Sequence, residues 1–171
     1  LTGSGTSTAA SDYASLSTIT ISAGSTTGTT TFNPTNDSVY EGSETAIIAI
    51  TGVSGGSAVE DGAQSQTITI TDSLAAPTAT LTASASTVSE KASDLTLTAT
   101  LNRSTYETVT VTLSTSGTST DGTDYASLSS ITISAGSTTG TTTFNPTSDT
   151  LFENSETAII AIDTVSGGGA T

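Results

Sequence analysis

The residues of this chain with the clearest chemical potential are carboxylates, and they fall into two short runs. Each run has the spacing D-x-x-x-E-x-x-E, and the runs begin at Asp37 and Asp149. Glycosidases use a pair of carboxylates as general acid and base, and Glu41 and Glu44 are a candidate pair of this kind. That chemistry also requires an aromatic-lined cleft, which a chain with four Tyr and three Phe is poorly equipped to build. We therefore expect no enzymatic activity.

The residue types that are missing exclude other chemistries. The chain has no Cys, His, Met or Trp, which excludes a zinc site, a thiol nucleophile, an imidazole base and a disulfide scaffold. Two cations, Lys91 and Arg103, stand against 16 acidic residues, and the formal net charge is -14. Such a surface predicts no nucleic-acid partner. No apolar run reaches the ~18 residues of a membrane span, and no signal peptide is recognisable.

The elements that must position the carboxylates are β-strands. Thr and Ser make up about two-fifths of the chain, a composition that also occurs in mucin-like stalks. The alternation of apolar residues with threonines favours a folded chain instead. Leu95, Leu97, Ala99 and Leu101, for example, are separated by single threonines. A period of two places the apolar side chains on one face of a sheet. The pattern predicts an all-β chain with strands at 18–22, 29–33, 45–51, 66–71, 78–84, 94–101, 108–114, 130–134, 141–145 and 157–163.

The sequence repeats itself with a period of 112 residues. The run Ile19–Thr35 recurs unchanged as Ile131–Thr147, and Asp12-Tyr13 recurs as Asp124-Tyr125. About three-quarters of the overlapping positions are identical, so internal repetition governs the architecture. A period near 110 residues with many short strands favours one immunoglobulin-like antiparallel β-sandwich per repeat.

The boundary between the repeats is expected near Pro77. This residue lacks an amide proton and follows Leu74-Ala75-Ala76 between two alternating segments. We therefore assign residues 1–75 to the later part of one repeat and residues 76–171 to the next repeat, without its final strand. Because the first residue is Leu and no Met occurs, we expect an excerpt of a longer or processed chain.

The carboxylate runs and their surroundings resemble the Calx-β repeat. This is the family of the calcium-binding domains of sodium/calcium exchangers and of many large bacterial surface proteins. The resemblance rests on the D-Y element, the Gly-bearing turn, the T-x-F-x-P strand end, the acidic run and Val88-Ser89-Glu90. It extends over nearly the whole chain and implies tandem Calx-β-type sandwiches.

The resemblance also implies Ca²⁺ as cofactor, held by carboxylates at one end of each sandwich. Ca²⁺ prefers six to eight hard oxygen ligands in a flexible shell. The family's tightest sites have two adjacent acidic residues where this chain has Asn36-Asp37 and Ser148-Asp149, which implies fewer ions or weaker binding. The backbone carbonyls of Val39 and Leu151 occupy positions that resemble main-chain ligands. Carried over by position, the metal ligands are Asp12, Asp37, Glu41, Glu44 and Asp72 in the first copy, and Glu90, Asp124, Asp149, Glu153 and Glu156 in the second.

Two interpretations of these carboxylates stay open at this point. Either they bind calcium, or they are solvated loop residues of an acidic extracellular protein. Tyr13 and Tyr125, which follow the aspartates, are interpreted as packing residues of the sandwich edge.

The repeats suit a structural or adhesive role outside the cell. Near-identical units in tandem build length, the lack of Cys and Met removes oxidisable positions, and net negative charge keeps long chains soluble. We expect a calcium-stiffened stalk, fibre or surface layer of a bacterial cell. The alternative is a binding module that recognises cell-surface glycans or a host protein through its loops.

Self-association is the expected partnership. The first copy lacks the strands that correspond to 78–84, 94–101 and most of 108–114, and the second lacks one that corresponds to 66–71. Exposed strand edges invite pairing with another chain. We expect neighbouring repeats or another copy to complete these sheets by strand addition, giving a filament or layer in which strands cross between units.

Overall fold

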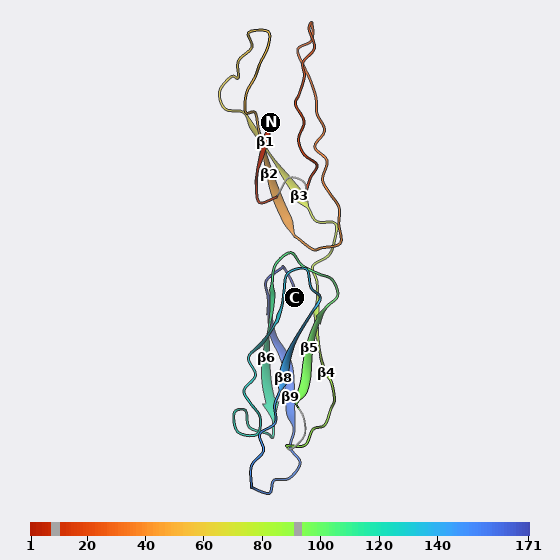
Figure 1. Ribbon diagram of the computed structural model, residues 1–171, viewed down its shortest axis with the longest axis vertical. Coiled ribbons are helices and arrows are strands. Elements are labelled where there is room, and N and C mark those ends of the chain that lie inside the picture. Colours follow the sequence, from red (N-terminus) through yellow and green to blue (C-terminus); the bar gives the residue numbers. More distant parts are fainter. Residues whose placement is uncertain (8–10, 91–93) are drawn as a thin grey trace. The chain divides into compact units, whose positions relative to one another are not determined.

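The fold is all-β, as the alternation predicted. The computed structural model describes residues 1–7, 11–90 and 94–171, and Lys91 lies outside them. These residues form nine strands in three antiparallel sheets (Figure 1). None of the described segments is a helix of the length and apolarity that crossing a membrane requires.

The chain divides into two compact units. The first contains Leu1–Asp37 and Gly42–Ser73, and the second contains Ser38–Glu41 and Leu74–Thr171. Each is described separately below.

The second unit is a sandwich of two three-stranded sheets. One sheet has the order β4-β5-β8, and the other has the order β7-β6-β9. The register of β6 and β9 shifts between Thr112 and Leu113, a β-bulge in the long ladder that the two strands form. The strands are β4 (Ala79–Ala83), β5 (Leu95–Leu101), β6 (Val109–Gly117), β7 (Ser130–Ile133), β8 (Thr139–Phe144) and β9 (Ala158–Ser166).

The core of this unit lies between the two sheets. In β5, Leu97, Ala99 and Leu101 are buried while the intervening threonines are more exposed, as the alternation requires. β6 contributes Val109 and Val111 in the same manner. β7 and β8 complete the cluster with isoleucines and a phenylalanine, so all four strands present one face inward.

The first unit contains one sheet, with the order β1-β2-β3. Its strands are β1 (Thr2–Gly5), β2 (Ser43–Ala49) and β3 (Ser65–Thr71). β3 runs antiparallel to β2 along its full length, from Ser43 opposite Thr71 to Ala49 opposite Ser65. The second unit has no counterpart of β3 among its described residues.

The strands predicted at 18–22 and 29–33 are wrong. These residues run as two extended segments without strand pairing (Figure 1). The same sequence forms β7 and β8 in the second unit, where β6 and β5 provide partners. None of the strands that the structure describes in the first unit pairs with 18–22 or 29–33, so no ladder forms there. β-structure depends on partners in this way more than helix does.

Candidate metal centre

Three segments of the second unit converge at one end of the sandwich. Glu90 follows β4, Asp124 lies between β6 and β7, and the segment from Asp149 to Glu156 connects β8 to β9. Antiparallel strands return the chain to the same end after every second strand, which is why carboxylates from distant positions meet there.

Asp124 is held by backbone contacts on both sides. Its carbonyl accepts a 2.9 Å hydrogen bond from the amide of Thr147, and its carboxylate accepts one from the amide of Thr120. The ring of the next residue, Tyr125, is buried and stacks on Phe144 with centroids 4.8 Å apart. Tyr125 is therefore a packing residue, as the sequence predicted, and it anchors the aspartate beside it.

Glu156 is held through its neighbour Thr157. The carbonyl of Thr157 accepts hydrogen bonds from the amides of Thr118 and Ser119 at 2.9 and 3.1 Å and from the Ser119 hydroxyl at 2.9 Å. Gly117 makes this approach possible, because its φ is +122° and a Cβ there would strike the carbonyl of Thr157. The loop that carries Asp124 is thereby tied to the start of β9.

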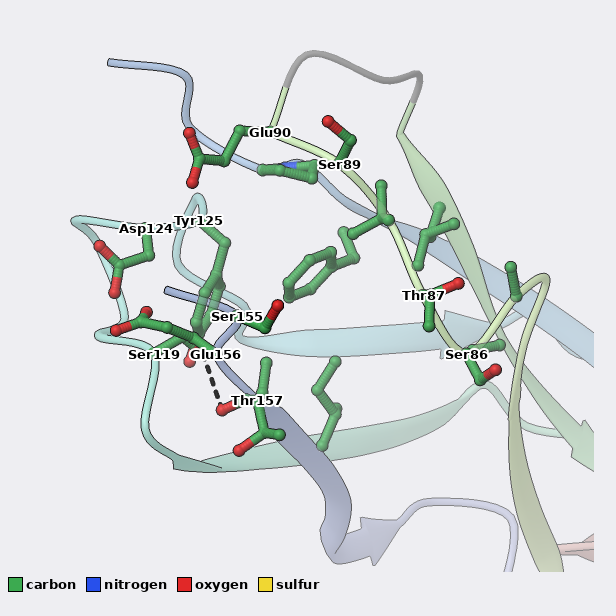
Figure 2. A pocket seen from close by; sticks show the side chains of 18 of the residues that line it. Ser86, Thr87, Ser89, Glu90, Ser119, Asp124, Tyr125, Ser155, Glu156 and Thr157 are labelled. Atoms are coloured by element: carbon green, nitrogen blue, oxygen red, sulfur yellow. Dashed lines mark hydrogen bonds between the residues drawn. The ribbon is translucent and has the colours of Figure 1, made fainter. Parts of the chain in front are cut away.

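The carboxylates face a common space. Glu90, Asp149 and Glu153 each offer an oxygen within 4.8 Å of the others. Glu90, Asp124, Glu153 and Glu156 line a cavity of about 840 Å³. Figure 2 shows Glu90, Asp124 and Glu156 at one side of this cavity, with the Ser119–Thr157 hydrogen bond beneath them.

The five carboxylates of this end repel one another. Partial loss of solvent raises the pKa of Glu153, and the negative charges of Asp149, Asp124 and Glu90 raise it further. The pKa of Glu156 is raised by the same loss of solvent, by a side-chain hydrogen bond with Asp124 and by the charges of Asp124, Glu153 and Glu90. Every charged group behind these shifts is a carboxylate, so this end favours a bound cation.

The first copy also groups three carboxylates, but only Glu41 has a counterpart, Glu153, in the group of the second copy. Asp12, Glu41 and Glu44 offer carboxylate oxygens within 4.8 Å of one another, and Asp12 is buried. The structure does not bring Asp37 or Asp72 into this group of three. Asp37 is exposed, and the Asp72 carboxylate accepts a hydrogen bond from the amide of Gly42 at 3.4 Å.

The sequence analysis missed the hydrogen bonds between a Thr-Ser pair and the threonine that follows the acidic run, Thr45 or Thr157. We call these contacts the Thr-Ser clamp. In the first copy, Ser7 donates to the carbonyl of Thr45 through its amide at 3.1 Å and its hydroxyl at 2.9 Å, as Ser119 does to Thr157. The signal was the triplet Gly-Thr-Ser, which occurs at 5–7 and again at 117–119. This triplet lies outside the acidic runs and contains no charged residue, so the search for metal ligands did not single it out.

Comparison with known proteins decides the family. The Calx-beta domain model matches residues 1–74 and again residues 75–170. The chain belongs to the Calx-beta family. No curated protein and no solved structure matched the chain in the same comparisons.

The Calx-beta match confirms the resemblance and the sandwich fold inferred from the D-Y element and the acidic runs. Calx-beta domains are generally associated with calcium and occur in extracellular or surface regions. The donor set of this chain fits such an ion, since carboxylates are the hard, anionic oxygens that Ca²⁺ prefers.

Proposed function

We propose that this Calx-beta chain binds calcium through the carboxylate end of each repeat. In the second repeat the ligands would be Glu90, Asp124, Asp149, Glu153 and Glu156. Glu90, Asp149 and Glu153 form the group of three carboxylates. The charges of Asp124 and Glu156 repel members of this group. The single observation that carries the proposal is this convergence of five carboxylates from separate loops. A divalent cation would neutralise their repulsion and connect the loops that carry them.

The wider role we propose is that of an extracellular structural repeat, in a stalk, fibre or surface layer of a bacterial cell. Supporting it are the near-identity of the two copies, the absence of Cys and Met, and the net charge of -14. Calcium is abundant outside cells, so binding at the repeat ends would couple rigidity to that environment.

Binding can be tested with Ca²⁺ directly and with Tb³⁺ as a luminescent substitute. Tyr125 lines the same cavity as four of the carboxylates, so excitation of tyrosine should sensitise Tb³⁺ bound there. We expect luminescence that Ca²⁺ competes away and that Glu153→Gln reduces. Asp163→Asn is the matched control, because Asp163 is an exposed carboxylate on β9. Equal luminescence from both variants would reject the assigned ligands.

A binding module for glycans or a host protein is the second candidate. One observation favours it: Leu151 and Phe152, within the acidic run, are 70% and 93% exposed. Exposed aromatic rings suit sugar faces and protein hot spots. A glycan array and a surface-protein panel probed with the chain and with Phe152→Ala would separate the roles. Binding lost in the variant supports recognition, whereas calcium binding without any captured partner supports the structural role.

A further inference from the structure

The outer face of the sheet β4-β5-β8 is made of threonines. In each of its three strands, threonines alternate with more deeply buried residues. Those on the outer face are Thr80, Thr82, Thr96, Thr98, Thr100, Thr139, Thr141 and Thr143. We call these eight residues the threonine grid. None of its positions carries a charge, although the chain as a whole has a net charge of -14.

The register of the strands aligns the grid in rows. One row joins Thr80, Thr100 and Thr139, a second joins Thr82, Thr98 and Thr141, and a third joins Thr96 and Thr143. Neighbouring strands lie about 4.8 Å apart, and side chains on one face of a strand repeat about every 6.7 Å. The grid therefore presents threonine side chains on a two-dimensional lattice with these two spacings.

The grid is stiff, and most of its hydroxyls are unpaired. Threonine is β-branched, which restricts its χ1 angle. The hydroxyls of Thr80 and Thr82 donate to carbonyls of the strand beside them at 3.3 and 3.4 Å. The hydroxyls of the other six form no hydrogen bond to any residue that the structure describes. A stiff surface of this kind loses little conformational entropy when a ligand covers it.

Strand propensity alone does not account for the grid. Threonine is favoured in strands generally, so propensity would place it equally on the outer face of the other sheet of this unit. There the exposed residues of β9 include Ile159, Ala161 and Asp163. The bulge between Thr112 and Leu113 also interrupts the register on that side. In the described part of the second unit, the regular and uncharged lattice is thus a property of one face only.

The composition of the grid selects an uncharged ligand. Calcium and nucleic acids require charged side chains, and the hot spots of protein interfaces are enriched in Trp, Tyr and Arg. The grid offers only hydroxyl and methyl groups, so charge complementarity favours a neutral, hydrogen-bonding partner. A regular lattice on the protein also suits a partner that is itself a lattice.

We infer that the threonine grid is a binding site for ice. The prism plane of ice arranges its oxygen atoms on a rectangular lattice whose two repeats are close to the spacings of the grid. Hydroxyl groups at these spacings can replace water molecules of the outermost ice layer, and the methyl groups beside them can fill the hollows between its oxygen atoms. Removing these methyl groups from liquid water adds hydrophobic stabilisation. The inference does not depend on calcium binding.

The size of the grid determines the effect that we expect. Neighbouring strands are rotated by about 20–25° relative to each other, so the match with a flat crystal face extends over few rows. The chain should therefore adsorb to ice and slow the growth of large crystals from small ones, without strongly lowering the freezing point.

The test measures how much of the full chain a slowly growing ice sample incorporates. We expect incorporation of the unchanged chain and a reduction of at least about tenfold by Thr98→Lys, because ice would have to desolvate a charge in the middle of the grid. Thr69→Lys is the matched control, since Thr69 is an exposed strand threonine of the first unit. This variant should be incorporated like the unchanged chain.

Because Thr98 is half-buried, a second variant separates loss of binding from loss of folding. Thr141→Lys changes an exposed residue of the same row, and it should reduce incorporation while the circular dichroism spectrum stays the same. Incorporation should be equal in Ca²⁺ and in EDTA. Exclusion of the unchanged chain from ice, or equal incorporation of all three variants, would overturn the inference. Binding to crystalline cellulose or chitin in place of ice would also overturn it and would assign the grid to a polysaccharide.

Discussion

Ile133 of β7 lies directly opposite Val109 of β6, and both side chains are completely buried. This pair joins two strands of one sheet and contributes to the core between both sheets. The corresponding Ile21 has no such partner. Substitutions at Ile133 and Ile21 can therefore be compared to measure how much the partner strand contributes to the free energy of unfolding.

Ile133→Ala should lower the free energy of unfolding of the second unit by about 2–5 kcal/mol, the range for removing a large buried aliphatic side chain. Ile21→Ala should change stability by less than about 1 kcal/mol, since its side chain is largely exposed. Urea unfolding followed by circular dichroism measures both. Equal effects would mean that Ile21 is buried in solution, contrary to the structure.

Removal of calcium should lower the melting temperature. A ligand that binds only the folded state stabilises it by mass action, by about 2.7 kcal/mol at a concentration one hundred times its Kd. Melting scans in millimolar Ca²⁺ and in EDTA give the shift, and Glu156→Gln should reduce it. Asp163→Asn should preserve it, and a melting temperature that ignores Ca²⁺ would contradict the proposed site.

Without calcium, stability should fall as the pH rises above about 4.5. The pKa values of Glu153 and Glu156 are raised above the ordinary 4.5, so between that value and the raised pKa the folded chain binds more protons than the unfolded chain. Stability decreases with pH wherever the folded state holds more protons. Denaturant midpoints measured from pH 4 to pH 7 should show this decline, and it should be smaller in Glu153→Gln. A rise over this interval in both proteins would contradict the repulsion.

Gly140→Ala should destabilise the second unit by about 1–3 kcal/mol, the usual cost of overpacking. A Cβ at this position in β8 would strike the backbone carbonyl of Thr132 in β7, which cannot move aside as a flexible side chain could. Thr141→Ala, at an exposed neighbouring position, serves as the control in the same unfolding experiment. A loss no larger than that of the control would show that the two strands are further apart.

Most of the fold could be predicted because it depends on local alternation. The pattern of Leu95 to Leu101 and that of Val109 to Leu113 place strands where β5 and β6 occur. β1 was missed because Thr-Gly-Ser-Gly has no apolar alternation, although Thr2 pairs with Ala49. The extended segments at 18–22 and 29–33 show the converse, since a correct strand pattern forms no strand without a partner.

The candidate site was predictable only as a set of residue types. The spacing from Asp149 to Glu156 and the upstream Asp124 indicated carboxylates at one end, but spacing does not determine which oxygens approach one another. Glu90, Asp149 and Glu153 form the tight group of the second copy, whereas the first copy groups Asp12, Glu41 and Glu44 and leaves out Asp37, the counterpart of Asp149. Clamps such as that of Ser119 on Thr157 hold the loops that carry the carboxylates, and they consist of hydrogen bonds to a backbone carbonyl without a charged signature.

The two copies of the run Ile19–Thr35 also give this chain an internal reference for conformational entropy. Fixing one residue's backbone costs about 1–2 kcal/mol, a quantity normally inferred by comparing different proteins or different sequences. Here one molecule holds the same sequence with its strand partners, as Ile131–Thr147, and without them. The difference in backbone order parameters between the copies would therefore report the entropy lost on docking a strand pair, because composition and local propensity are the same at every position.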